Sequence, residues 1–320
     1  LFCCFFFLFF FLFFFVVVFF FLFFFFSSRR RHTRFLPVSW ARNVYKRQAV
    51  NIVLDITLVY GVDNYIPAMG VKGAAWASLI AQAIMAVIAL IILLKKTDLS
   101  LRLRFPLHPE IKRLVVMSLN LFVRSIALNA ALMLAVKEAA GLGKEYIAAH
   151  AIAINIWLFS AFFLDGYGAA GNALSGRLVG EKDFGSLWQL TKKINFYNLG
   201  VASLLLLLGI LFYNPLGTLF NKDPDVLSIF YGMFFMVLIS QPLNALAFTL
   251  DAIFKGIGEM GYLRNVLLGA TVFGFIPVLY FTKYLDLGLI GIWAAILVWI
   301  AFRAFALIIK FKNKYYPLAT

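Results

Sequence analysis

The sequence predicts an all-α, polytopic helical membrane protein with about eight transmembrane helices, and three observations support this fold class. Of the 320 residues, 63% are hydrophobic and only 13% are charged, whereas soluble domains carry roughly 25% charged residues. From Asn51 onward the apolar residues form long continuous stretches, each sufficient to cross a hydrocarbon core of about 30 Å as a helix of roughly 20 residues. These stretches lack the alternation of apolar and polar residues that the strands of a membrane barrel require.

The first 48 residues differ from the rest of the chain. Residues 1–26 contain 17 phenylalanines, whereas a spanning helix mixes several apolar residue types and has its aromatic residues near its ends. They also lack the basic start and the small-residue cleavage site of a signal peptide. The segments 27–34 and 39–48 resemble translated sequencing-adaptor read-through. We therefore expect residues 1–48 to be artefactual, rather than a phenylalanine-rich anchor with a basic flank, and we look for function from residue 49 onward.

Eight apolar stretches follow, separated by short turn signals such as Asn214-Pro215 and Asp223-Pro224. Each stretch is read as one helix that crosses the membrane, because its length and continuity match the hydrocarbon core. The predicted spans lie at approximately 49–62, 72–94, 112–136, 146–173, 190–212, 226–250, 262–281 and 288–310.

Basic residues differ in number between the two ends of these spans. Excluding residues 1–48 leaves 22 Lys and Arg residues, of which 15 fall on one side of the membrane and 5 on the other, while Arg124 and Arg303 lie within spans. Because cytoplasmic loops carry an excess of Lys and Arg, this bias predicts a cytoplasmic C-terminus. We expect a multi-pass protein of the plasma (inner) membrane. The net charge of +15 therefore indicates orientation in a membrane and not nucleic-acid binding, since the basic residues occupy short loops.

A weak internal repeat predicts the domain organisation. The segments 70–77 and 288–295 share the placement of Gly, Trp and Ala residues, and each opens a span of the same predicted orientation. A parallel repeat of two lobes would make 49–94 the last two helices of an N-terminal lobe, 95–111 a cytoplasmic linker and 112–315 a complete six-helix lobe. We accordingly expect the first four helices of the N-terminal lobe to be missing from this chain.

Several motifs in the predicted C-terminal lobe resemble the multidrug and toxic compound extrusion (MATE) family, in particular its DinF-like branch. They are LFVRS at 121–125, FFLDGYGAAGNALSGRLVG at 162–180, QPLN at 241–244 and LDAIFKG at 250–256. The resemblance runs from about residue 50 to the end of the chain. It implies a transporter of twelve helices, in which two six-helix lobes face a central cleft. It also implies that any coupling residue on the family's first helix is absent here.

This resemblance implies a cation-coupled antiporter that exports cationic or amphipathic compounds by alternating access. We expect it to act as a monomer in the lipid bilayer, to bind no nucleic acid, and to need neither a metal nor a cofactor beyond its coupling ion, Na⁺ or H⁺. One alternative is a flippase for lipid-linked saccharides, which would line the cleft with several basic residues. Another is a non-transport membrane protein. An enzyme is disfavoured, because His108 and His150 lie on opposite predicted sides and no G-x-x-x-x-G-K-[ST] motif for ATP is present.

Asp165 is the first candidate for binding the coupling cation. A charge at this depth in a span costs about 2.5–3.5 kcal/mol, so it is expected to serve a purpose. Asp165 shares one helical face with Gly168 and Asn172, and small residues there leave room for water or an ion. We predict a carboxylate that binds H⁺ or Na⁺ in the cleft. The alternative is a carboxylate near the cytoplasmic end of the helix, capped by donors from a loop.

Asp251 is the second candidate, at the end of a polar stripe through Gln241 and Asn244. Lys255 follows four residues later, so an ordinary interfacial ion pair is equally consistent with the sequence.

Arg124 lies within the 112–136 span, on a face that it shares with Asn120. It could extend to the basic side of the membrane, but its depth favours a pair with a carboxylate.

Overall fold

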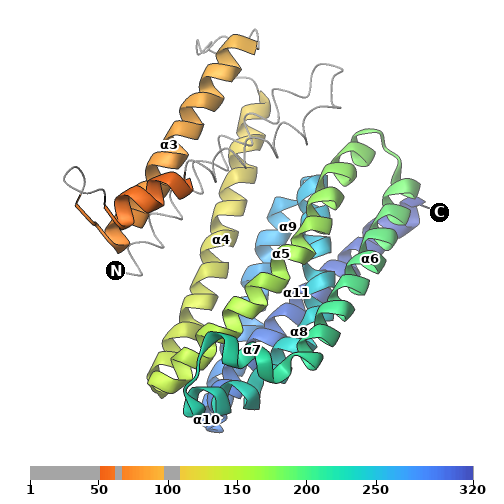
Figure 1. Cartoon of the computed structure of the whole chain (residues 1–320). Coiled ribbons are helices and arrows are strands. Elements are labelled where there is room, and N and C mark those ends of the chain that lie inside the picture. The colour runs from red at the N-terminus through yellow and green to blue at the C-terminus, as the bar shows by residue number, and fades with distance from the viewer. Residues whose placement is uncertain (1–50, 62–66, 97–108, 320) are drawn as a thin grey trace. The chain divides into compact units, whose positions relative to one another are not determined.

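The computed structural model describes residues 51–61, 67–96 and 109–319, and the secondary structure in these ranges is helical, with no strand. The chain divides into two compact units, residues 1–108 and residues 109–320 (Figure 1). The absence of strands in the described ranges agrees with the all-α fold class predicted from the sequence. The proposed read-through segment, residues 1–48, lies outside the described residues.

In the first unit, a helix over residues 51–59 is followed by α3 (Val71–Lys96). Gly73 allows these helices to approach closely, because a Cβ atom there would overlap the carbonyl oxygen of Leu58. Gly70 opens α3 with a positive φ of 54°, a conformation that glycine adopts without strain. The predicted span 72–94 corresponds to α3, within which Lys72–Ile88 forms an apolar helix shorter than a full span. The predicted span 49–62 lies partly outside the described residues.

The second unit contains six helices that are long and apolar enough to cross a membrane. They confirm the six spans predicted after residue 109, each extended by several residues. In chain order they are α4 (Pro109–Leu142), α5 (Lys144–Gly180), α6 (Phe184–Leu211), α8 (Pro224–Ile257), a helix composed of α9, η1 and α10 (Met260–Tyr284), and α11 (Gly288–Ala319).

Local sequence determines where several of these helices begin and end. Asp183 caps the N-terminus of α6, where its Oδ1 accepts a hydrogen bond from the Ser186 backbone N–H at 2.9 Å. Asp223 caps α8 in the same way, with Pro224 at the first helical position. At the other end of α8, Gly258 has a φ of +91° and terminates the helix in the left-handed conformation.

Two local features were not predicted from the sequence. The turn expected at Asn214-Pro215 is a short helix, α7 (Tyr213–Phe220), because proline is tolerated in a first helical turn, where its missing N–H leaves no bond unmade. The predicted span 262–281 is interrupted by a π-helical segment, η1 (Ala270–Phe275), between α9 (Met260–Gly269) and α10 (Ile276–Tyr284). The apolar pattern predicts a helix but does not distinguish an α-helical turn from the wider turn of a π-helix.

Helix α8 lies at the centre of the second unit and packs against α5, α6 and α11 (Figure 1). Its contact with α5 depends on small residues. Gly168 meets Phe248 and Ala252, Gly171 meets Ile253, and Gly176 meets the carbonyl oxygen of Gly256. These contacts advance in the same direction along both helices, so α5 and α8 run parallel and in a fixed register. The polar residues of α8 are thereby placed between α5 and α11.

Candidate functional site

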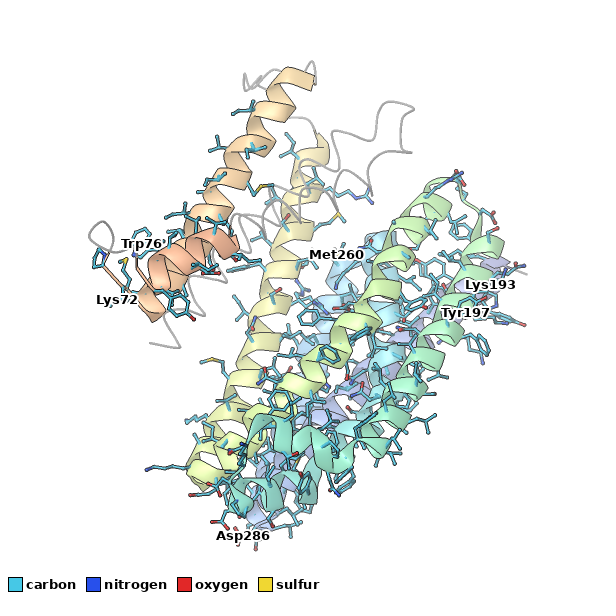
Figure 2. All side chains as sticks on the ribbon, viewed as in Figure 1. Lys72, Trp76, Lys193, Tyr197, Met260 and Asp286 are labelled. Atoms are coloured by element: carbon cyan, nitrogen blue, oxygen red, sulfur yellow. The ribbon has the colours of Figure 1, made fainter. Side chains whose placement is uncertain are left out.

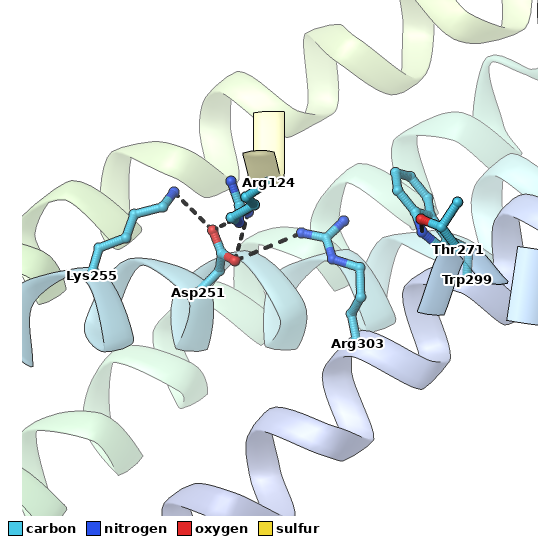
Figure 3. Close-up of polar contacts among 6 residues, drawn as sticks. All are labelled: Arg124, Asp251, Lys255, Thr271, Trp299 and Arg303. Atoms are coloured by element: carbon cyan, nitrogen blue, oxygen red, sulfur yellow. Dashed lines mark hydrogen bonds and ion pairs between the residues drawn. The ribbon is translucent and has the colours of Figure 1, made fainter. Parts of the chain in front are cut away.

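Asp251 is the centre of a charged cluster that joins α4, α8 and α11 (Figure 3). The Nη2 of Arg124 on α4 lies 2.6 Å from each carboxylate oxygen of Asp251. The Nζ of Lys255, one turn later on α8, lies 2.8 Å from Oδ2. The Nη2 of Arg303 on α11 lies 3.9 Å from Oδ1. Three cationic side chains from three helices therefore surround one carboxylate.

The cluster is buried inside the lobe. The side chains of Asp251, Arg124 and Arg303 are 8%, 9% and 3% exposed. Arg303 is also held by aromatic rings, since its guanidinium carbon lies 5.1 Å from the ring centroid of Trp299 and 5.9 Å from that of Phe248. Charges at such depth persist when each is paired or hydrogen-bonded. The cluster therefore links three helices through contacts that are shielded from solvent.

The structure brings Arg124 and Asp251 together, and also forms the Asp251–Lys255 pair that the spacing of these residues allowed. Both oxygens of Asp251 already accept from Arg124. A further cation would therefore meet a carboxylate that Arg124 and Lys255 already neutralise.

Asp165 lies at the edge of the α5–α8 interface. Leu164, Gly168 and Gly171 form the buried stripe that faces α8, while Asp165 is exposed. Asp165 interacts electrostatically with the cluster around Asp251, but it makes no hydrogen bond or ion pair within 4.0 Å with the described residues. Among the two candidate carboxylates, Asp165 is thus the one whose oxygens have no cation in direct contact.

The other polar residues predicted for the site are not part of the cluster, and each forms hydrogen bonds elsewhere. Asn120 accepts a hydrogen bond from Nη1 of Arg264 at 2.7 Å. Gln241 donates to the carbonyl oxygen of Val237 at 3.1 Å, and Asn244 donates to Oγ of Ser240 at 3.2 Å. Asn172 takes part through its backbone, because its carbonyl oxygen accepts a hydrogen bond from Oγ of Ser175 at 3.1 Å.

Two buried groups at helix contacts, Arg303 and Asn198, had no role predicted from the sequence. Arg303 was visible as a charge within a span, but its partner lies on another helix. Asn198 on α6 donates through Nδ2 to Oγ1 of Thr249 at 2.6 Å and to the carbonyl oxygens of Leu164 and Ala245 at 3.3 and 3.4 Å. The sequence signal that was available for Asn198 is its place, together with Asn195, in the apolar span predicted at 190–212. Asn198 thus connects α5, α6 and α8 next to the charged cluster.

The described part of the chain holds no group of three or more His, Cys, Asp or Glu side chains placed to bind a metal ion. Instead, the site combines a carboxylate enclosed by cations with a second carboxylate nearby. Such an arrangement can respond to protonation, because adding or removing one charge changes the attraction between helices.

The chain is similar in sequence to known proteins from a plant and from a bacterium. The protein DETOXIFICATION 43 of Arabidopsis thaliana is 30% identical over 260 residues, which cover 80% of this chain and 47% of that protein. The DNA damage-inducible protein F of Escherichia coli (strain K12) is 26% identical over 264 residues, which cover 81% of this chain and 55% of that protein. The chain therefore spans about half the length of these curated relatives.

The fold has solved counterparts as well. The structure of a multidrug resistance MATE family transporter of the MOP superfamily, in an outward-facing conformation, matches with a TM-score of 0.74 at 20% identity, over 85% of this chain and 61% of that one. This likeness shows the fold. The MatE family model matches residues 121–281, just over half of the chain, and this range includes Arg124, Asp251 and Lys255 of the charged cluster. On this match, and with the six-helix lobe that accompanies it, the chain belongs to the MatE family.

Proposed function

We propose that this protein is a secondary active transporter that exports small cationic or amphipathic compounds across the inner membrane in exchange for protons. Membership of the MatE family supports transport, and the matching solved structure carries the description of a multidrug resistance transporter. The observation that carries the proposal is the pair of carboxylates. Asp251 is neutralised by Arg124 and Lys255, while Asp165 lies within electrostatic range of the same cations without direct contact.

The charge balance of the site favours H⁺ over Na⁺ as the coupling ion. Arg124, Lys255 and Arg303 contribute three positive charges, whereas Asp165 and Asp251 contribute two negative ones. A sodium ion entering this region would be repelled by the excess positive charge and would need several oxygen ligands, while both oxygens of Asp251 already accept hydrogen bonds from Arg124. A proton needs one lone pair of Asp165 and no additional space.

Protonation of Asp165 would weaken the electrostatic attraction between α5 and the cluster. The ionised carboxylate is attracted to Arg124, Lys255 and Arg303, and the neutral acid loses this attraction. Asp251 would keep α4, α8 and α11 joined in both states. The proton thus binds two arrangements of the lobe with different affinity, which is the condition for an ion to drive a conformational change.

The second candidate function is a flippase for lipid-linked saccharides with anionic head groups. The sequence showed only two basic residues within spans, but the structure gathers Arg124, Arg303 and Lys255 in one place. An excess of buried positive charge suits an anionic substrate. Competition experiments separate the two candidates. Transport by a flippase would be inhibited by an anionic polyprenyl diphosphate and not by ethidium, whereas transport by the proposed exporter would be inhibited by ethidium.

The proposed function is tested by Asp165→Asn in the complete gene, expressed in cells that are loaded with ethidium. Because this variant cannot exchange a proton at residue 165, we expect efflux driven by a pH gradient to fall by about tenfold or more. Asp286→Asn is the matched control, since Asp286 lies exposed at the far end of the lobe, in a turn with a positive φ that asparagine tolerates (Figure 2). If both variants retain the wild-type rate, proton coupling through Asp165 is wrong.

A further inference from the structure

Five buried polar side chains on α5, α8 and α11 carry atoms that have no hydrogen-bond partner among the described residues. All five side chains are at most 5% exposed. The atoms are Nδ1 and Nε2 of His150, Nε1 of Trp157, Oε1 of Gln241, Oδ1 of Asn244 and Nε1 of Trp293. Native proteins leave few buried polar groups unpaired, because each costs about 1–3 kcal/mol. Five such side chains on the packed helices α5, α8 and α11 therefore indicate a shared hydrogen-bond partner.

Ring contacts and helical spacing place these groups in a row along the lobe. The rings of His150 and Trp293 lie 5.8 Å apart and connect α5 to α11. Trp157 follows His150 by two helical turns on the same face of α5, and its ring lies 6.0 Å from that of Phe248 on α8. Asn244 precedes Phe248 by one turn, and Gln241 precedes it by two, so both amides lie on the same side of α8.

The row ends at the charged cluster. The guanidinium carbon of Arg303 lies 5.9 Å from the ring centroid of Phe248, and Nη2 of the same residue lies 3.9 Å from Asp251. Nε of Arg124, on the far side of Asp251, is also buried without a partner among the described residues. At its other end, the row begins with His150, six residues after the first residue of α5. Since α5 and α8 run parallel, the row extends from one end of the lobe to the cluster.

The chemistry of the unpaired atoms identifies their partner. The two indole N–H groups only donate, the two amide oxygens only accept, and a neutral imidazole does both. A bound cation would satisfy the oxygens alone, and a bound anion the N–H groups alone. Water donates and accepts, and buried waters usually make about three hydrogen bonds to groups of this kind. A second lobe cannot supply the partners, because the atoms themselves are enclosed by this one.

We propose that a column of water molecules fills this row and connects the charged cluster to the end of the lobe where His150 lies. The column brings water from the predicted outer side of the membrane to the cluster near Asp165, where this water can supply the proton that Asp165 binds, and this role rests on the proposed function above. Along such a column each water accepts one proton and releases another to its neighbour, so that charge moves without a net change in any bond.

Hydrogen exchange of the tryptophan indole groups tests the column directly. The full chain is labelled with ¹⁵N-tryptophan, placed in lipid nanodiscs and transferred to deuterated water, and each indole signal is assigned by a Trp→Phe variant. We expect the Nε1–H groups of Trp157 and Trp293 to exchange about a hundredfold faster than that of Trp299. Trp299 is the matched control, because it lies on α11, is 1% exposed, and donates to Oγ1 of Thr271 at 3.1 Å (Figure 3). Equal protection of all three indoles would overturn the proposal.

A substitution within the row supplies the second measurement. Asn244→Leu removes an acceptor for water with little change in volume, so we expect slower exchange at Trp157 and unchanged protection at Trp299, whose signal also reports that the lobe is folded. Asn155→Leu is the control, because Asn155 is exposed on α5 close to Trp157 and donates to its own helix at 2.7 Å. If Asn244→Leu leaves exchange at Trp157 unchanged, the column is excluded. Because exchange needs no transport, this failure is distinct from a failure of the Asp165→Asn efflux test.

Discussion

At the scale of single residues, the site depends on pairs that join distant parts of the chain. The Asp251–Lys255 contact could be predicted from the sequence, because residues four apart meet on a helix. For Arg124, depth in its span favoured a carboxylate partner, but the sequence could not select Asp251, which lies 127 residues away. Arg303 was also left unassigned, since its neighbours Phe248 and Trp299 are brought to it only by packing.

Removal of one member of the buried pair should destabilise the lobe. We expect Arg124→Leu to lower the free energy of unfolding by about 3–5 kcal/mol, because Asp251 then loses its closest counter-ion. The retained Lys255, at 2.8 Å, places the effect at the low end of this range. The measurement is reversible unfolding in mixed micelles. Arg177→Ala breaks an exposed pair with Glu181 and should change stability by less than about 1 kcal/mol. Equal effects of the two variants would contradict a stabilising role for the buried pair.

At the scale of helices, apolar runs and turn signals account for most of what the sequence predicted. Asp223-Pro224 marks the start of α8, but its end at Gly258 was not predicted and lies beyond the expected boundary at residue 250. The π-helical segment Ala270–Phe275 could not be predicted, because it depends on how one spanning helix fits its neighbours. The same holds for the small residues of α5. Their sequence indicated close helix approach, but the partner helix and its register became known from the structure.

Gly256 is the tightest of these contacts and gives a direct test of the α5–α8 packing. A Cβ atom at this position would overlap the carbonyl oxygen of Asn172 and Oγ of Ser175. We expect Gly256→Ala to lower the free energy of unfolding by about 1–3 kcal/mol. Gly200→Ala, in α6 with nothing within 4 Å of the added methyl group, should be neutral or stabilising by up to about 1 kcal/mol. A destabilisation by Gly200→Ala as large as that by Gly256→Ala would contradict this packing.

The cap of α6 predicts a local dependence on pH. The hydrogen bond from Ser186 holds the pKa of the Asp183 carboxyl below its usual range. A group with a lowered pKa in the folded state stabilises at neutral pH, and the stabilisation is lost as the pH falls through that lowered pKa. We expect backbone amides in the first turn of α6 to exchange faster at pH 3 than at pH 5, relative to the first turn of α5, where no side chain caps the helix. In Asp183→Asn this extra pH dependence should disappear, and its persistence would exclude the carboxyl as its source.

At the scale of the whole molecule, composition and span length were sufficient to predict the six-helix lobe, which the solved family structures share. The division into an N-terminal pair, a linker and a C-terminal lobe remains a prediction. So does the orientation in the membrane. Charge bias predicts it from the loops alone, placing Lys193 in the cytoplasm and Asp286 outside. These residues lie at opposite ends of the second unit (Figure 2).

Cysteine labelling in whole cells checks this orientation. The cysteines of the sequence, Cys3 and Cys4, are first replaced by serine, and a single cysteine is then placed at Asp286 or at Lys193. We expect a membrane-impermeant maleimide to label Asp286→Cys in intact cells and Lys193→Cys only after lysis. The reverse labelling pattern would contradict the predicted orientation and place Asp286 in the cytoplasm.

The central claim is that Asp165 releases a proton when substrate occupies the transporter. It is tested most directly by mixing the purified product of the complete gene with ethidium in weakly buffered solution and following a pH-sensitive dye. We expect ethidium to release protons from the wild-type protein and from Asp286→Asn, and to release none from Asp165→Asn while still binding. Undiminished proton release from Asp165→Asn would contradict the claim.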